Sequence, residues 1–193
     1  MWRTLGDVAY VSTAFPFRKK VETEEGGDVV LVQIKDLDGA EGVAAPGTVT
    51  LRNEGGKYER YLLHPEDLLF QSRGSRHPVA VVEPGIRGIA AAGLHTIRPE
   101  RTRVLPEYLA WWLNHPKSQA TLSRDLARGT YIPFVAKSDL AKLRVLVPPL
   151  HVQHRIVEVD RLRKQERELR RRLDELTQQL VDGVTLAAAT RND

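Results

Sequence analysis

Residues 151–182 read HVQHRIVEVDRLRKQERELRRRLDELTQQLVD, follow the pair Pro148-Pro149, and contain no proline or glycine until Gly183. This stretch predicts a helix of about nine turns, roughly 48 Å long at 1.5 Å per residue, which is longer than an ordinary globular helix. A narrow apolar seam on a seven-residue repeat is typical of a coiled-coil strand. One heptad position holds Val159, Leu173 and Leu180, with Glu166 interrupting it, and the other holds Leu162, Leu169 and Leu176. A single strand cannot bury its own seam, so we expect this helix to need a partner.

The residues before the helix are sufficient for one domain with a sizeable core. The composition, with 41% hydrophobic and 28% charged residues, is that of a globular protein. No apolar run approaches the roughly 18 residues of a membrane span, and the N-terminus lacks a secretory-signal pattern. The absence of cysteine excludes disulfides and thiolate metal sites. We therefore expect a cytoplasmic protein from a reducing compartment.

The net charge is +4 and the pI is near 9.5. Because the helical end is nearly balanced in charge, most of this excess belongs to the first 149 residues. A mild positive excess permits a nucleic-acid partner but does not demonstrate one.

The pattern before the helix predicts an α+β fold, a small globular domain of mixed short strands followed by the one long helix. Expected strands cover residues 29–34, 49–51, 58–63, 67–70, 79–82 and 143–147. Pro106 is suited to the first turn of a helix over residues 107–114, and a second helix is expected over 117–128, closed by Gly129. The expected boundaries are 1–149 for the domain, 150–185 for the coiled-coil helix and 186–193 for a flexible tail.

The chain lacks the usual arrangements of reacting groups. No acidic residue lies two positions before a lysine, no Gly-x-Gly occurs, and Gly56-Lys57 is followed by Tyr58 and not by Ser or Thr. These absences argue against metal-dependent nuclease and nucleotide-cradling chemistry. His151 and His154 could share one side of the helix start, either as metal ligands without a visible third partner or as solvated histidines. We expect no catalytic residue, no metal and no cofactor.

The most suggestive binding segment is the loop at residues 71–77, which gathers hydrogen-bonding side chains around Gly74. Arg bonds guanine bidentately, Gln bonds adenine, and Ser and His reach phosphates or base edges. The DNA-contact candidates in this loop are Gln71, Ser72, Arg73, Ser75, Arg76 and His77. The alternative interpretation is a polar turn between two strands.

Three further segments carry candidates for DNA contact. The densest basic run before the helix is suited to phosphate contact, or is a solvated loop. A strand end and a second loop could also reach a ligand. The residues are Arg18, Lys19 and Lys20; Gln33 and Lys35; and Arg128, Thr130 and Tyr131. Trp111 and Trp112 are adjacent on an expected helix, so we expect one in the core and the other covering the long helix or another subunit.

Residues 140–157, LAKLRVLVPPLHVQHRIV, are more specific than a generic strand-to-helix joint. They resemble the end of a target recognition domain in the specificity (S) subunits of type I restriction–modification systems, where a last strand, a Pro-Pro-Leu joint and a Gln lead into a long helix. Other stretches resemble the family in the same order along nearly the whole chain: LGDV at 5–8, QIKDL at 33–37, DLLF at 67–70, SRG at 72–74, PEYL at 106–109, LN at 113–114 and GT at 129–130.

The resemblance implies a domain that reads one half of a split double-stranded DNA target, and a helix that acts as a spacer and a dock for methyltransferase (M) and restriction (R) subunits. Cleavage and methylation would belong to those partners. A full-length S subunit usually has two recognition domains and two helices paired antiparallel, whereas this sequence has one of each. We therefore expect a half-subunit that forms a homodimer through its seam and reads a palindromic target with a spacer. A truncated product, or a chain that pairs with another S polypeptide, is the alternative.

A different class of function also fits the long helix. A protein-interaction adaptor would assemble partners through its coiled coil and bind no DNA. The two hypotheses differ in salt response, because a DNA reader loses affinity steeply as salt rises.

Overall fold

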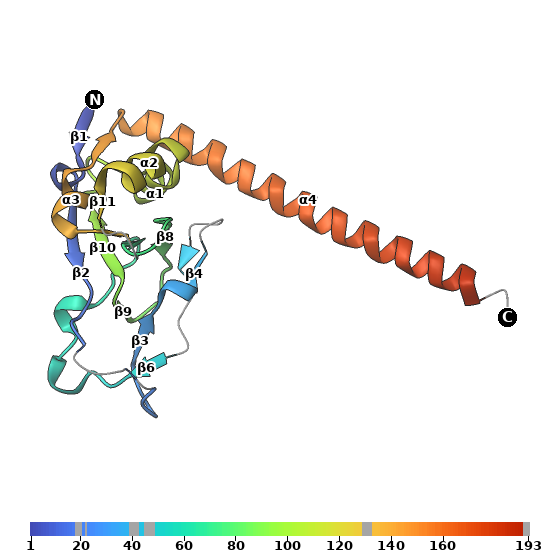
Figure 1. The fold of residues 1–193 in the computed structure, drawn as a ribbon, viewed down its shortest axis with the longest axis horizontal. Coiled ribbons are helices and arrows are strands. Elements are labelled where there is room, and N and C mark those ends of the chain that lie inside the picture. The colour runs from blue at the N-terminus through green and yellow to red at the C-terminus, as the bar shows by residue number, and fades with distance from the viewer. Residues whose placement is uncertain (18–20, 22, 39–42, 45–48, 129–132, 191–193) are drawn as a thin grey trace. The chain divides into compact units, whose positions relative to one another are not determined.

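A computed structural model describes residues 1–17, 21, 23–38, 43–44, 49–128 and 133–190. The chain divides into two compact units, Met1–His154 and Arg155–Asp193. The first unit contains every described strand and the second is helical, which confirms the α+β class with a long C-terminal helix (Figure 1).

The first unit is built on a six-stranded sheet with the order β2-β10-β7-β8-β5-β4. Neighbouring strands are antiparallel except for the parallel pair β5 and β8. Gln71 pairs with Leu94, and the next residue, His95, pairs with Thr13. The loop after β7 and the end of β2 therefore lie at the same end of the sheet. The bounds are β2 (Ala9–Thr13), β4 (Leu37–Asp38), β5 (Val43–Ala44), β7 (Leu68–Gln71), β8 (Val79–Val82) and β10 (Leu94–Pro99).

A three-stranded sheet of β6 (Val49–Leu51), β3 (Val29–Val32) and β9 (Gly88–Ala90) lies at the lower end of the domain in Figure 1. The buried cluster at this sheet includes Leu31, Ile89 and the neighbouring Tyr58, with Phe15 and Phe17 packed against them. Gly27 precedes β3 where a Cβ atom would lie 2.6 Å from the Leu51 nitrogen, so only glycine allows this close approach of the two chains.

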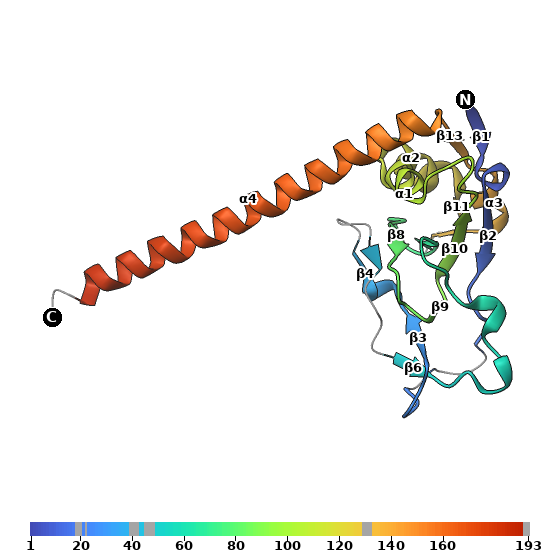
Figure 2. The ribbon, with the colours of Figure 1, turned by 180° about the vertical axis from the view of Figure 1, so that it is seen from behind.

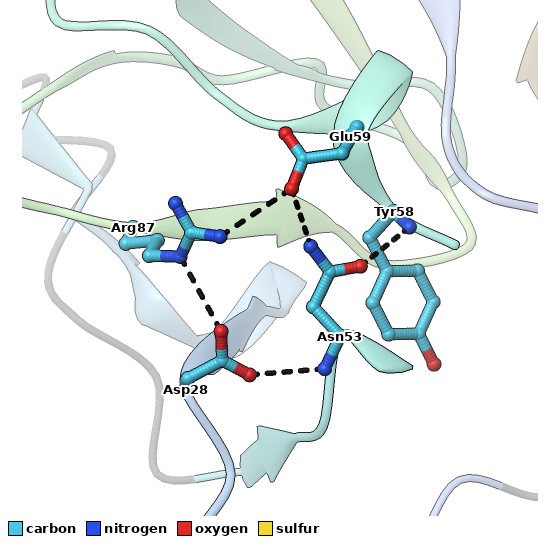
Figure 3. Close-up of polar contacts among 5 residues, drawn as sticks. All are labelled: Asp28, Asn53, Tyr58, Glu59 and Arg87. Carbon is cyan, nitrogen blue, oxygen red and sulfur yellow. Dashed lines mark hydrogen bonds and ion pairs between the residues drawn. The ribbon is translucent and has the colours of Figure 1, made fainter. Parts of the chain in front are cut away.

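The expectation of a strand over residues 58–63 is wrong. It forms the short 3₁₀ helix η4 (Glu59–Tyr61), preceded by η3 (Glu54–Gly56). Asn53 holds this turn: its backbone nitrogen donates to Asp28 (2.9 Å), its Nδ2 donates to Glu59 (2.6 Å), and its Oδ1 accepts from the Tyr58 nitrogen (2.8 Å), as Figure 3 shows. The contact with Asp28, which lies 25 residues away, and the burial of the Tyr58 ring override the local strand preference.

Arg87 completes this polar cluster from the loop before β9. Its guanidinium lies 3.6 Å from Asp28 and 3.5 Å from Glu59 (Figure 3). All three side chains are more than half exposed, so solvent screens both ion pairs and neither contributes much to stability. The hydrogen bond from the Tyr58 nitrogen to Asn53 Oδ1 is the stronger constraint on the turn.

Helices cover the other end of the domain. Pro106 begins α1 (Pro106–Asn114) in the predicted first-turn position. Asn114 fastens α1 to the sheet by accepting from the Val79 nitrogen (2.9 Å) and donating to its oxygen (2.7 Å). Trp112 is buried, as expected for one of the two rings, and Trp111 is partly exposed. That Trp111 covers the long helix or another subunit stays a prediction.

The predicted helix over residues 117–128 is only partly correct. Helix α2 (Pro116–Thr121) gives way to a π-helical turn, η5 (Leu122–Leu126), and then to β11 (Ala127–Arg128). The reason is tertiary, because Leu122 is buried and β11 pairs with β12 (Phe134–Val135). Gly129, the expected helix cap, lies outside the described residues.

The domain closes by bringing its two ends together. Strand β1 (Trp2–Thr4) pairs antiparallel with β13 (Arg144–Leu146), and α3 (Lys137–Lys142) packs beside β2 (Figure 2). The domain also contains two further 3₁₀ turns, η1 (Leu5–Asp7) and η2 (Ile34–Asp36).

Gln153 fixes the first turn of α4 (Leu150–Thr190) within the domain. The side chain is fully buried; its Oε1 accepts from the Leu105 nitrogen (2.8 Å), and its Nε2 donates to the oxygens of Arg103 (3.0 Å) and Pro148 (2.8 Å). One amide thus satisfies three backbone groups, which is why a glutamine suits this position of the joint.

The second unit is the continuation of α4, which runs to Thr190, beyond the boundary expected at residue 185. Gly183 does not end the helix, because the sequence after it contains Ala187, Ala188 and Ala189, which favour helix. Ion pairs spaced three or four residues apart, such as Arg161 with Glu158 (2.6 Å) and Arg170 with Glu166 (2.7 Å), follow its surface. Although α4 is long, no helix of the described part of the chain has the apolar run that a bilayer span requires.

Candidate nucleic-acid interface

The loop after β7 is held to the rest of the domain through its backbone. Gly74 has a φ of +112°, a conformation that favours glycine, and its nitrogen donates to the Pro133 oxygen (2.9 Å). The Val135 nitrogen donates to the Ser72 oxygen (2.8 Å), and Arg73 forms a β-bridge with Phe134. The side chains of this loop are therefore presented from a braced backbone, as a recognition element requires.

Ser72 and His77 are buried and face inward. The Ser72 hydroxyl donates to the Gly93 oxygen (2.8 Å). The His77 ring stacks on Phe70, with centroids 5.6 Å apart, and its Nδ1 lies 2.9 Å from the Gln71 oxygen. Burial lowers the pKa of His77, so the neutral ring donates from Nδ1 to that carbonyl. These two residues support the loop in this structure, and their side chains are not at its surface.

Arg73, Ser75 and Arg76 are exposed. Among the described residues, neither arginine has a carboxylate partner, so both guanidinium groups are free for a ligand. Gln71 is half-buried, and its Nε2 donates to the Arg73 oxygen (2.6 Å), which steadies the start of the loop. The loop thus has two exposed arginine side chains, whereas Ser72 and His77 face the interior of the domain.

A second predicted segment lies against this loop. Gln33 precedes η2 and its nitrogen donates to Asp36 (2.8 Å), so the turn that carries the exposed Lys35 is capped. The two segments meet at Gly93, where a Cβ atom would lie 3.0 Å from Ile34 Cδ1 and 3.9 Å from Arg73 Cδ. Gly93 itself has a φ of +91°, so the turn after β9 both needs glycine and leaves room for its neighbours.

Of the remaining candidates for DNA contact, only Arg128 has a described backbone. Arg128 lies in β11, whose backbone pairs with Phe134 directly beside Arg73. Arg18, Lys19, Lys20, Thr130 and Tyr131 lie outside the described residues, as does the side chain of Arg128. Sequence reasoning missed Phe134, which is 43% exposed and sits between β11 and the loop. Its signal in the sequence was an aromatic residue directly after Pro133.

The helix presents a separate candidate surface. Its seam residues Val159, Leu162, Leu169, Leu173, Leu176 and Leu180 are 51–68% exposed. Isolated exposed leucines are common, but a continuous row of them along one helix marks an interaction surface.

Across the ranges that the structure describes, no three His, Asp or Glu side chains gather where they could hold a metal ion. His151 and His154 are both exposed at the start of α4.

Comparison with known protein families shows to which family this chain belongs. The family model of the type I restriction modification DNA specificity domain matches residues 1–177. The chain belongs to this family. Among curated proteins, no sequence matches it significantly.

Solved structures of specificity subunits share the fold. The HsdS subunit from Thermoanaerobacter tengcongensis is 26% identical, with a TM-score of 0.61 over 89% of this chain and 44% of that one. A chain from a structure of the complex assembly and conformational transition of the type I R-M system has a TM-score of 0.64 at 21% identity, over 89% of this chain and 40% of that one. The S subunit from M. genitalium has a TM-score of 0.56 at 17% identity, over 82% and 37%. The specificity-family chain described here thus spans about two fifths of the length of these structures.

Proposed function

We propose that this chain is a DNA-specificity subunit whose first unit reads one half of a split duplex target. The observation that carries the proposal is the convergence at Gly93 of the segments bearing Lys35, Arg73 and Arg76, in a chain of the DNA specificity family. Exposed guanidinium groups on a braced loop suit bidentate bonding to guanine in the major groove. Lys35, as a flexible point charge, is suited to a neighbouring phosphate.

The seam of α4 supports the second part of the proposal, which is pairing with α4 of a second copy. Two such helices would bury the leucines that each leaves exposed, at about 25 cal/mol per Å² of apolar surface. A homodimer places two identical readers about a twofold axis, so its target is palindromic with a spacer. Methyltransferase and restriction subunits, docked on this dimer, would supply methylation and cleavage, and this chain would contribute no reacting group.

The charges along α4 favour an antiparallel pair. Residues 155–172 carry eight basic and four acidic side chains, whereas residues 173–190 carry Asp174, Glu175 and Asp182 and no basic side chain. A parallel pair would set like ends side by side, and an antiparallel pair sets the acidic end of each helix beside the basic start of the other. The helix dipoles favour the same arrangement.

Engineered cysteines test this orientation, because the chain has none of its own. In a parallel pair, Leu162→Cys meets its own copy and forms a disulfide. In an antiparallel pair centred near residues 168–171, the two copies of position 162 are roughly 18–27 Å apart, too far for the roughly 7 Å limit between Cα atoms. We expect Leu162→Cys to cross-link with Leu173→Cys or Leu180→Cys and not with itself; efficient self-linking would refute antiparallel pairing.

A salt titration of duplex binding tests the reading function. A DNA reader loses affinity linearly in log K against log salt, whereas a protein adaptor shows no duplex binding at any salt. The measurement is made on the full chain with and without its methyltransferase subunits. Absence of duplex binding in both preparations would support the adaptor and overturn the proposal.

A further inference from the structure

A cavity of about 370 Å³ lies against the edge strand β2. Its floor is formed by two cross-strand pairs, Ser12 with Thr96 and Tyr10 with Arg98. Because side chains alternate along a strand, Val11 and Ile97 between these pairs point to the opposite face and are buried in the core. The sheet therefore supplies a rigid, polar floor.

One charged pair is built into this floor. Asp67 is buried and accepts two hydrogen bonds from the Arg98 guanidinium, each 2.7 Å long. The bidentate pair neutralises the arginine and fixes its plane against the sheet. Its role is to shape the cavity and not to supply free charge.

Two other cations enter the cavity from separate elements, each resting on a tyrosine. Lys137, the first residue of α3, has its Nζ 5.7 Å from the centre of the Tyr10 ring. Arg60, in η4, has its Cζ 4.9 Å from the Tyr61 ring and donates to the Tyr61 hydroxyl (3.0 Å). Cation–π contacts hold such groups in place without removing their charge.

These two cations are free to meet an anion. Both are exposed, and among the described residues neither has a carboxylate partner. In the part of the chain that the structure describes, no Asp or Glu lines the cavity, whose remaining polar side chains include Ser12 and Thr96 from its floor. Two positive charges, hydroxyl groups and aromatic walls together suit a phosphate group.

Two connections place the cavity near the loop at residues 71–77. Lys137 follows Phe134 by three residues, at most about 11 Å along the chain, and Phe134 is bridged to Arg73. Thr13 lies at the end of the sheet where Gln71 begins the loop. A duplex that presents bases to Arg73 and Arg76 would therefore bring its backbone toward Lys137.

We propose that this cavity is a phosphate-binding subsite for the DNA backbone, in which Lys137 and Arg60 neutralise a phosphodiester beside the base-reading loop. This inference rests on the proposed function and deepens it. The subsite carries no sequence information; it positions the duplex so that the loop meets the bases in one register.

The test compares Lys137→Ala and Arg60→Ala, singly and together, with the charge-matched control Arg52→Ala. Arg52 is an exposed arginine that follows β6 and bonds the Glu25 oxygen, outside the cavity. Affinity is measured across salt on a duplex with the target and on an unrelated duplex. We expect each cavity variant to weaken both duplexes by the same factor and to reduce the salt slope by about 0.9 for each phosphate that is no longer neutralised, with Arg52→Ala unchanged.

The outcomes separate the subsite from the function. If the unaltered protein prefers its target but the double variant keeps the full salt slope, the subsite is wrong and the reading function stands. If the unaltered protein binds no duplex, both are wrong. Loss of target preference in Lys137→Ala, with binding to the unrelated duplex unchanged, would also overturn a backbone role. Inorganic phosphate at constant ionic strength tests a free anion as the occupant: tight binding there, with an unchanged DNA salt slope, contradicts the proposal.

Discussion

Replacing Gln153 by alanine should destabilise the domain more than any other single change at the start of α4. The substitution removes one acceptor and two donors from a fully buried site and leaves the Leu105 nitrogen and the oxygens of Arg103 and Pro148 without their partner. At about 1 kcal/mol net per hydrogen bond, the expected loss in free energy of unfolding is about 2–4 kcal/mol. For a domain of this size that corresponds to a fall in Tm of roughly 4–16 °C.

Urea unfolding followed by circular dichroism measures this loss as a lower midpoint at unchanged slope. Gln178→Ala is the matched control, because Gln178 is an exposed glutamine on the same helix whose side chain makes one bond, to Asp182. Its expected cost is about 0.2–0.5 kcal/mol. Gln153→Glu keeps the acceptor but turns a carboxylate oxygen toward two carbonyls, so it should destabilise at least as much as alanine at neutral pH. If Gln153→Ala costs no more than Gln178→Ala, the role assigned to the buried amide is wrong.

Three other perturbations address the loop, the seam and the buried histidines. Arg73→Ala and Arg76→Ala should each weaken target binding by about 1–3 kcal/mol and relax base preference, as read by competition with altered duplexes; unchanged preference in both would exclude this loop as the reader. Leu169→Asp should shift the chain from dimer to monomer in sedimentation, and an undiminished dimer would contradict pairing through the seam. Burial lowers the pKa of His77 and His95, so the unfolded chain binds more protons below about pH 6.5; stability should be complete above pH 7 and fall on acidification by up to about 1.4 kcal/mol per pH unit per histidine, and a rise on acidification would refute their neutral state.

The elements that sequence predicts correctly are those set by local pattern. The heptad seam and the proline pair that precedes it are enough to predict α4, and Pro106 marks the start of α1. Elements set by distant contacts are predicted poorly. The chain at Tyr58 has the composition of a strand, yet Asn53 and a buried aromatic cluster turn it into a 3₁₀ helix. In the same way, the predicted helix over 117–128 gives way after Thr121 to a turn that feeds β11 into its pairing with β12.

The candidate site shows the same division. The residue types of the loop could be read from sequence. The inward direction of Ser72 depends on Gly93, which lies elsewhere in the chain, and that of His77 depends on stacking against Phe70 of β7. The cavity beside β2 had no sequence signal at all. Its cations, Arg60 and Lys137, are isolated in the sequence and come together only because η4 and α3 flank the same strands.

Selection from a pool of random duplexes by the purified chain, alone and with its methyltransferase subunits, tests the central claim most directly. The proposed homodimer of identical readers predicts enrichment of two inverted copies of one short sequence, separated by a spacer of fixed length. Enrichment of a single asymmetric half-site would contradict the symmetric dimer, and absence of any enriched sequence in both preparations would contradict the reading function itself.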